Sequence, residues 1–199
     1  MLLYANGDSH TAPWSYIDVI GESFGINVVN DAVGGSSNAS IIRRTRTFLQ
    51  NTTPDLIIIG WSTWEREEWL IDDEYYQITA SGTDDVPAHF TDAYKNYVAG
   101  VDWKNKTKQA HEDIWQFHLE LEQLGAKHIF FNGNNDFSKI KDQKEWGSSY
   151  IDPYGDTTFN KVVGASCDTV SPISWHYGTD GHRVWAQYLT RYIVANRLI

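Results

Sequence analysis

The 199-residue chain has one cysteine, five prolines and no apolar run approaching the roughly 20 residues that a membrane-spanning helix needs. The single cysteine, Cys167, excludes an intramolecular disulfide and fits a reducing compartment. The N-terminus lacks a basic region followed by a long apolar stretch, so no signal peptide is expected. These absences predict a chain without a membrane span, cytoplasmic by default.

Positive charge is also scarce, because 16 Lys and Arg residues stand against 26 Asp and Glu residues for a net charge of −10. This negative charge argues against a nucleic-acid partner, whose phosphates repel it. Arg43, Arg44 and Arg46 form a tight basic cluster, interpreted as a solvated helix face. No group of His, Cys and acidic residues has the spacing of a metal site, and no glycine-rich phosphate loop occurs. We therefore expect neither a metal nor another cofactor.

Aromatic residues, by contrast, are abundant, with nine Trp and eleven Tyr. Most such side chains fill a core, whereas others line grooves that stack against sugars. The sequence leaves both roles open for the tryptophans near the motifs described below.

Short apolar runs alternate with amphipathic spacings along the chain. Strands are expected at residues 2–5, 26–29, 56–59 and 128–131, with a fifth near 161–163. Helices are expected at 14–24, after a cap at Ser36 or Ser37, at 104–124 and from near 180 to 197. This alternation predicts a parallel sheet with helices on both faces.

Two stretches interrupt the alternation. Residues 62–103 are polar, aromatic and acidic, and residues 133–175 are rich in Gly, Asn, Asp and Ser. Both are longer than a simple connection between elements. We interpret them as insertions over the carboxyl edge of the sheet, within a single domain of residues 1–199.

Four polar motifs follow the expected strands or open the last helix. They are Gly7-Asp8-Ser9-His10 and the segments 30–36, 60–63 and 176–182. The carboxyl ends of parallel strands meet at one edge of a sheet, where open α/β folds bind ligands. The hydroxyl of Ser9 and the imidazole of a distant histidine are therefore expected to approach one another at this edge.

This ordered series of motifs resembles the SGNH hydrolases, also called the GDSL esterase/lipase family. Gly7-Asp8-Ser9 matches the first block of the family, which implies that Ser9 is the nucleophile. Asn30 and Gly35 match the spacing of the second block, whose glycine supplies an oxyanion-hole amide.

The last block of the family is matched by His176, with Gly181-His182 after it. The resemblance implies that His176 is the base, with His182 as its rival. It also implies a three-layer α/β/α sandwich with a flavodoxin-like parallel sheet of about five strands. The reaction implied is ester hydrolysis without a metal, and the many aromatic residues favour an O-acetylated carbohydrate over a lipid as substrate.

Two positions depart from the family pattern. Ser62 stands where the third block has an Asn that donates to the oxyanion, so the Ser62 hydroxyl joins the amides of Ser9 and Gly35 as a candidate donor. Ile173 stands where the family has an Asp three residues before the catalytic His. The imidazole then needs another orienting group, such as Asp168, Asp8 or a backbone carbonyl, unless serine and histidine act as a dyad.

Candidate substrate contacts come from the same motifs and their neighbours. They are His10, Trp61, Trp64, Asn134 and Trp175. The segment 133–136 reads Gly-Asn-Asn-Asp, the literal third-block pattern, but it follows the fourth strand and is interpreted as a turn that can still restore the missing donor. Arg66 is a candidate contact for an anionic substrate group.

The two departures together favour a second hypothesis from another functional class. It is a catalytically weak or inactive SGNH-like module that binds carbohydrate or forms part of a virion. A third hypothesis is acyl transfer to an acceptor bound under residues 62–103. The oligomeric state, the natural substrate and the source are left open.

Overall fold

The structure is a computed structural model that describes residues 1–80 and 86–199. A four-stranded sheet runs through its centre in the order β2-β1-β3-β6. Its strands are β1 (Leu2–Asn6), β2 (Asn27–Asn30), β3 (Leu56–Trp61) and β6 (His128–Asn132). All three strand pairings are parallel, so the four carboxyl ends meet at one edge.

The central strands are apolar because both faces of the sheet are covered. Every residue of β3 is buried, as expected for a continuous apolar run in a parallel sheet. Strand β2 at the edge instead alternates between exposed and half-buried residues. The pattern of apolar residues therefore predicted both the presence of these strands and which of them is central.

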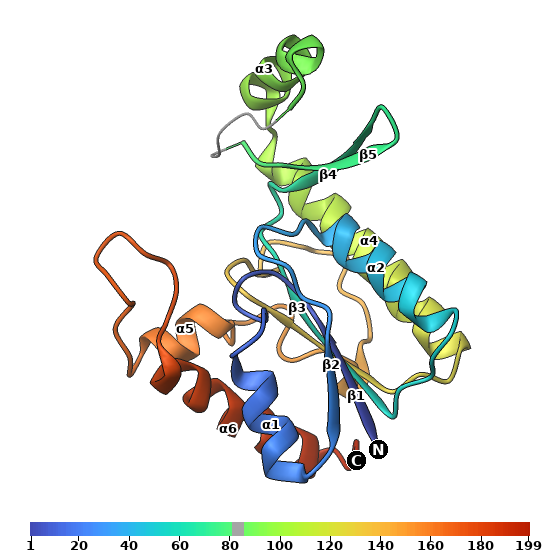
Figure 1. The fold of residues 1–199 in the computed structure, drawn as a ribbon, viewed down its shortest axis with the longest axis vertical. Helices are drawn as coiled ribbons and strands as arrows, with labels where there is room; N and C mark the ends of the chain where they lie inside the picture. The colour runs from blue at the N-terminus through green and yellow to red at the C-terminus, as the bar shows by residue number, and fades with distance from the viewer. Residues whose placement is uncertain (81–85) are drawn as a thin grey trace.

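Helices cover each face of the sheet and make two separate cores (Figure 1). On one face, α1 (Tyr16–Phe24), α5 (Phe159–Gly164) and α6 (Thr179–Ala195) pack against the side chains of Leu3 and Ile58. On the other face, α2 (Asn38–Leu49) and α4 (Trp103–Gln123) pack against Tyr4, Ile57 and Phe130. This arrangement is a three-layer α/β/α sandwich, as predicted.

Helix caps fix where the loops between strands and helices end. Ser15 caps α1 by accepting from a backbone amide, and the Asp18 carboxylate accepts in turn from the Ser15 amide at 2.9 Å. Ser37 caps α2 by accepting from the Ser40 amide at 3.2 Å. The expectation that Trp14 belongs to α1 is wrong, because it precedes the cap with a φ of +70° and its side chain is 93% exposed.

The expected fifth strand near 161–163 is also wrong. These residues lie in α5, which Thr158 caps by accepting from the Lys161 amide at 3.2 Å. Beyond β6, an isolated parallel bridge between Phe130 and Tyr150 extends the sheet. Val162 and Val163 favour a strand by their β-branched side chains, but they form part of a helix that begins after the cap at Thr158.

The two stretches that interrupt the alternation have different structures. After β3, β4 (Glu67–Ile71) and β5 (Glu74–Ile78) form an antiparallel hairpin. They are followed by the 3₁₀ helix η1 (Ala88–Phe90) and by α3 (Thr91–Gly100). Figure 1 shows the hairpin and α3 extending away from the carboxyl edge of the sheet, opposite the two termini. Residues 81–85 of this predicted insertion lie outside the described residues.

The second stretch, residues 133–175, contains the 3₁₀ helix η2 (Gly147–Ser149), α5 and irregular loops. No helix in the described part of the chain is both long and apolar enough to cross a bilayer.

Candidate active site

The hydroxyl of Ser9 and the imidazole of His176 are in hydrogen-bond contact although 167 residues separate them. Ser9 lies in the loop after β1, and His176 lies in the loop that leads into α6. Ser9 Oγ is 2.8 Å from His176 Nε2, within reach of direct proton transfer. Both residues were predicted from the sequence, and the fold brings them together at the carboxyl edge of the sheet.

The other ring nitrogen of His176 faces a hydroxyl rather than a carboxylate. His176 Nδ1 lies 3.4 Å from Ser174 Oγ, and the same oxygen accepts from the His176 amide at 3.1 Å. A proton on Nδ1 leaves the lone pair of Nε2 directed at Ser9. Ser174 was not identified from the sequence, because its role depends on a loop conformation.

A tight turn presents Ser9 at the end of β1. The amides of Thr11 and Ala12 both donate to the Asp8 carbonyl at 3.0 Å. A Cβ at Gly7 would lie 2.4 Å from Thr11 Oγ1 and 2.9 Å from the Gly60 carbonyl, so only glycine fits here. The first glycine of the motif is therefore required by the close approach of β3.

The loop after β2 contains two glycines, and it brings Gly34 beside Ser9. Gly35 has a φ of +79°, and a Cβ at Gly34 would lie 3.7 Å from the Ser9 Cβ. Asn30 anchors this loop to the first one by donating from Nδ2 to the Thr11 carbonyl at 2.7 Å. Among the described residues, the amides of Ser9, Gly34 and Gly35 donate to no other group. These three amides therefore remain free to donate to a bound group.

Ser62 does not provide the expected third donor. Its hydroxyl donates to Asp8 Oδ2 at 3.2 Å and accepts from Arg66 Nη1 at 2.7 Å. A hydroxyl has a single proton, and here that proton is directed at the Asp8 carboxylate. Asp8 is paired with Arg66 at 3.0 Å, so the expectation that Asp8 orients His176 is also wrong.

The His10 ring lies beside the imidazole of His176. Its ring centroid is 5.4 Å from that of His176 and 4.8 Å from that of Phe159, and its side chain is buried. Burial lowers the pKa of His10, and the nearby His176 and Arg66 add to this effect while Asp8 opposes it. Burial therefore favours the neutral form of the His10 ring, which lies tilted against the imidazole of His176.

His182, the predicted rival of His176, has no contact with Ser9. Its ring stacks near Tyr16 at 6.3 Å between centroids and lies 6.0 Å from Phe159. Burial lowers the pKa of His182, with smaller contributions from His10 and His176. The ring of His182 therefore packs between α1 and α5 and not against the Ser9 hydroxyl.

The expected aromatic wall is wrong for Trp61, because its side chain is buried, and Trp64 is also almost fully buried although it lines the cavity described below. The Trp61 ring packs edge-on against Phe130 at 4.9 Å, and the Trp64 ring stacks on Phe137 at 4.8 Å. Both tryptophans belong to the core between the sheet and α4. Trp175, in contrast, is 75% exposed beside His176.

Asp168 does not orient His176. It is exposed and forms no hydrogen bond or ion pair with any of the described residues. Asn134 is exposed, and its Oδ1 accepts a hydrogen bond from Asn160 Nδ2, whereas a role of its own Nδ2 as a donor at Ser9 stays a prediction.

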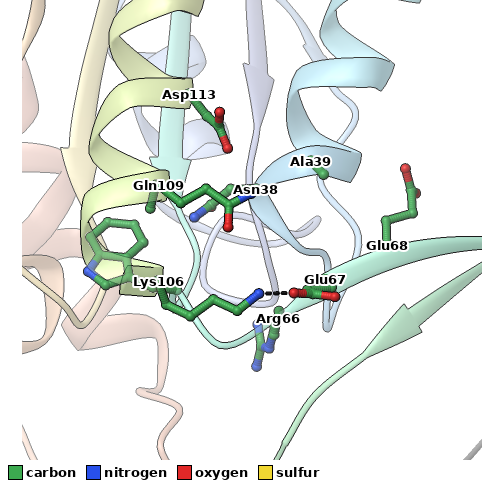
Figure 2. A pocket seen from close by; sticks show the side chains of 10 residues that line it. Asn38, Ala39, Arg66, Glu67, Glu68, Lys106, Gln109 and Asp113 are labelled. Carbon is green, nitrogen blue, oxygen red and sulfur yellow. Dashed lines mark ion pairs between the residues drawn. The ribbon is translucent and has the colours of Figure 1, made fainter. Parts of the chain in front are cut away.

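A polar cavity of about 260 Å³ lies next to Arg66, between α2, α4 and β4. Figure 2 shows Lys106 reaching across this cavity to form an ion pair with Glu67. Gln109 and Asp113 also line the cavity, and burial raises the pKa of Asp113. Arg66 connects the cavity to the pair of Asp8 and Ser62, and this connection was not evident from the sequence.

The fold is that of the SGNH hydrolases, as solved structures that match nearly the whole chain show. A candidate lipolytic protein of the G-D-S-L family from Desulfitobacterium hafniense DCB-2 has a TM-score of 0.57 at 15% identity, covering 96% of this chain and 98% of its own. TesA has a TM-score of 0.62 at 13% identity, with 100% of both chains covered. The acetyl xylan esterase AlAXEase has a TM-score of 0.54 at 12% identity, covering 97% of this chain and 100% of its own.

No protein-family profile and no curated protein sequence matches the chain. At such low identities the similarity concerns the fold alone. The chemistry must be argued from the residues at the edge of the sheet.

Proposed function

We propose that the protein is a serine esterase-type hydrolase with Ser9 as nucleophile and His176 as general base. The observation that carries this proposal is the 2.8 Å contact between Ser9 Oγ and His176 Nε2. A nucleophile and base in direct contact, with a third group behind the base, is the arrangement that activates a serine. The matching fold of known esterases supports the same reaction class.

The proposed reaction forms and then hydrolyses an acyl-enzyme. Ser9 Oγ attacks the ester carbonyl carbon while its proton passes to His176 Nε2. The amides of Ser9, Gly34 and Gly35 stabilise the negative oxygen of the tetrahedral intermediate. The alcohol leaves with the proton from His176, and a water activated by the same imidazole releases the acid.

Two features lower the expected rate relative to a complete site. A missing side-chain donor in an oxyanion hole typically costs on the order of 100- to 1000-fold. The Ser174 hydroxyl is neutral, so it stabilises the imidazolium of His176 less than a carboxylate does. We therefore propose an active but slow esterase.

We propose a carbohydrate ester, such as an O-acetylated sugar, as the substrate. Trp14 and Trp175 are 93% and 75% exposed on the loops that carry Ser9 and His176. Exposed indole rings stack on the apolar faces of sugars. The polar cavity at Lys106 and Gln109 offers hydrogen-bond partners to hydroxyl groups.

Hydrolysis of p-nitrophenyl acetate and of acetylated xylo-oligosaccharides tests this proposal. Ser9→Ala and His176→Ala are each expected to abolish release of acetate, whereas His182→Gln should retain most of the activity. The proposal fails if wild-type protein with a folded circular dichroism spectrum hydrolyses neither ester. It also fails if Ser9→Ala keeps the wild-type rate.

The alternative is a binding module with the same fold and no turnover. It is favoured by the Ser174 hydroxyl, which lies at His176 Nδ1 in place of a carboxylate, and by the engaged hydroxyl of Ser62. Titration of sugars against intrinsic tryptophan fluorescence would then reveal binding by both wild type and Ser9→Ala. Trp175→Ala should remove that binding, and neither protein should release acetate.

A further inference from the structure

Two buried histidines face one another at the end of the sheet opposite Ser9. His118 lies on α4, and His128 is the first residue of β6. His118 Nδ1 is 2.8 Å from His128 Nε2, and both side chains are buried. Since β6 is parallel to β1, its amino end lies at the edge away from the catalytic loops (Figure 1).

An acidic side chain completes the group. Glu122 follows His118 by four residues on α4, which places both on the same helix face. One ligand atom from each of His118, Glu122 and His128 lies within 4.8 Å of the other two. The group therefore offers two imidazole nitrogens and one carboxylate oxygen within the span of a single metal ion.

The tautomer of His128 is fixed in the form that binds metals. His128 Nδ1 lies 2.8 Å from the Ala126 carbonyl, which can only accept a hydrogen bond. The ring proton is therefore on Nδ1, and the lone pair of Nε2 points toward His118. An imidazole whose other nitrogen donates to a backbone carbonyl is the usual arrangement around a metal-ligating histidine.

We propose that His118, Glu122 and His128 form a zinc-binding site, with His118 Nδ1, His128 Nε2 and a Glu122 oxygen as ligands and water in the fourth position. Two imidazoles and one carboxylate suit Zn²⁺ better than Mg²⁺ or Ca²⁺, which prefer oxygen ligands alone.

The geometry requires only a small adjustment. Zinc–nitrogen bonds of about 2.0–2.1 Å in a tetrahedron set the two nitrogens about 3.3 Å apart. The rings must therefore separate by about half an ångström from their 2.8 Å contact. The proton that His118 Nδ1 donates in the hydrogen-bonded pair moves to Nε2 of the same ring, so both imidazoles stay neutral.

The surroundings favour a bound ion as a structural cross-link. The rings of Trp115 and Trp146 lie 5.0 Å and 5.3 Å from that of His118, so the two histidines are shielded by indole rings. A metal here would tie the end of α4 to the start of β6 across the short connection between them. The spacing of these residues predicted no metal site, because His128 joins the other two only through the packing of α4 on the sheet.

Metal-stripped protein titrated with ZnCl₂ against a chromophoric chelator tests the proposal. We expect one equivalent of Zn²⁺ to bind, and one equivalent of Co²⁺ to give the visible absorption of a tetrahedral site. Zinc should also raise the melting temperature by roughly 3 °C or more, since it binds only the folded site.

Three variants locate the binding. Glu122→Gln removes an exposed carboxylate, so the fold should persist while zinc affinity falls about tenfold or more. His118→Gln should remove the Co²⁺ absorption. His89→Gln removes an exposed histidine that pairs with Asp72 at a distance from this group, and it should bind zinc as wild type does.

The proposal is overturned if wild type binds no zinc at tens of micromolar. It is equally overturned if Glu122→Gln binds zinc as tightly as wild type, which would leave a hydrogen-bonded histidine pair as the whole role of this group. Because Glu122→Gln alters an exposed residue, the test does not depend on whether His118→Gln folds.

Discussion

Replacing Ser174 tests how the imidazole of His176 is held. The Ser174→Ala variant loses a neutral hydrogen bond of 3.4 Å between Ser174 Oγ and His176 Nδ1. Such a bond contributes about 0.5–1.5 kcal/mol, and a contact this long on an exposed loop belongs at the lower end. Since about 1.4 kcal/mol equals a factor of ten in rate, we expect kcat/KM to fall by about two- to fivefold.

The reverse change should restore part of what the site lacks. Ser174→Asp places a carboxylate two residues before His176, where it can accept from Nδ1 and stabilise the imidazolium. We expect a higher kcat/KM than that of wild type, because the added carboxylate stabilises the imidazolium that forms during the reaction.

The assay is hydrolysis of p-nitrophenyl acetate from pH 5 to pH 9, with Ser171→Ala as the matched control. The Ser171 side chain forms no hydrogen bond within the described residues, so this variant should keep the wild-type profile. The reasoning is refuted if Ser174→Ala loses as much activity as His176→Ala. It is also refuted if Ser174→Asp lowers kcat/KM while the fold is intact.

Three further variants test the supporting structure. Arg66→Leu leaves the buried Asp8 carboxylate without its 3.0 Å partner, so the free energy of unfolding in urea should fall by about 3 kcal/mol. The double variant with Asp8→Asn should recover most of that loss, and a failure to recover would exclude the ion pair as the cause. Gly35→Ala places a side chain on a residue with a φ of +79°, so it should lower the free energy of unfolding by about 1 kcal/mol and kcat by at least tenfold. An unchanged kcat would show that the Gly35 amide does not contact the oxyanion. Because burial lowers the pKa of His10 in the folded state, the unfolded state binds more protons, so the contribution of His10 to the free energy of unfolding is complete above about pH 6.5 and falls as the pH drops toward the lowered pKa. His10→Phe should therefore flatten the dependence of the free energy of unfolding on pH, measured by denaturation between pH 5 and pH 8. An unchanged dependence would assign it to other groups.

The central strands and the layer arrangement were predictable because their signals are local. The run Leu56–Ile59 has no polar residue, and burial on both faces of a parallel sheet requires such a run. The stretch near 161–163 has a similar local signal, but the cap at Thr158 and packing against α6 make it helical. Short apolar segments are decided by their neighbours rather than by their own composition.

The candidate catalytic pair was predictable only through the motifs. Ser9 follows β1 and His176 precedes α6, as expected, and the fold brings the two side chains together at one edge of the sheet. The side chains around them were harder to predict. Trp64 was expected near the substrate, yet it stacks on Phe137, a partner 73 residues away that no local pattern indicates.

The network around Asp8 illustrates the same limit. Ser62 occupies the family's donor position, so its hydroxyl was expected to face the substrate. Arg66, four residues later, instead forms an ion pair with Asp8 and donates to the Ser62 hydroxyl, which itself donates to Asp8. The direction of a hydroxyl proton depends on this charge partner, and the spacing of motifs does not encode it.

The central claim is that Ser9 is an activated nucleophile, and covalent labelling tests it most directly. The protein is incubated with a fluorophosphonate, digested, and its peptides are mapped by mass spectrometry. The account predicts one phosphonyl adduct on Ser9 Oγ, with labelling slowed strongly in His176→Ala and absent in Ser9→Ala. Folded wild-type protein that acquires no adduct, or that is labelled at another residue, would contradict the account.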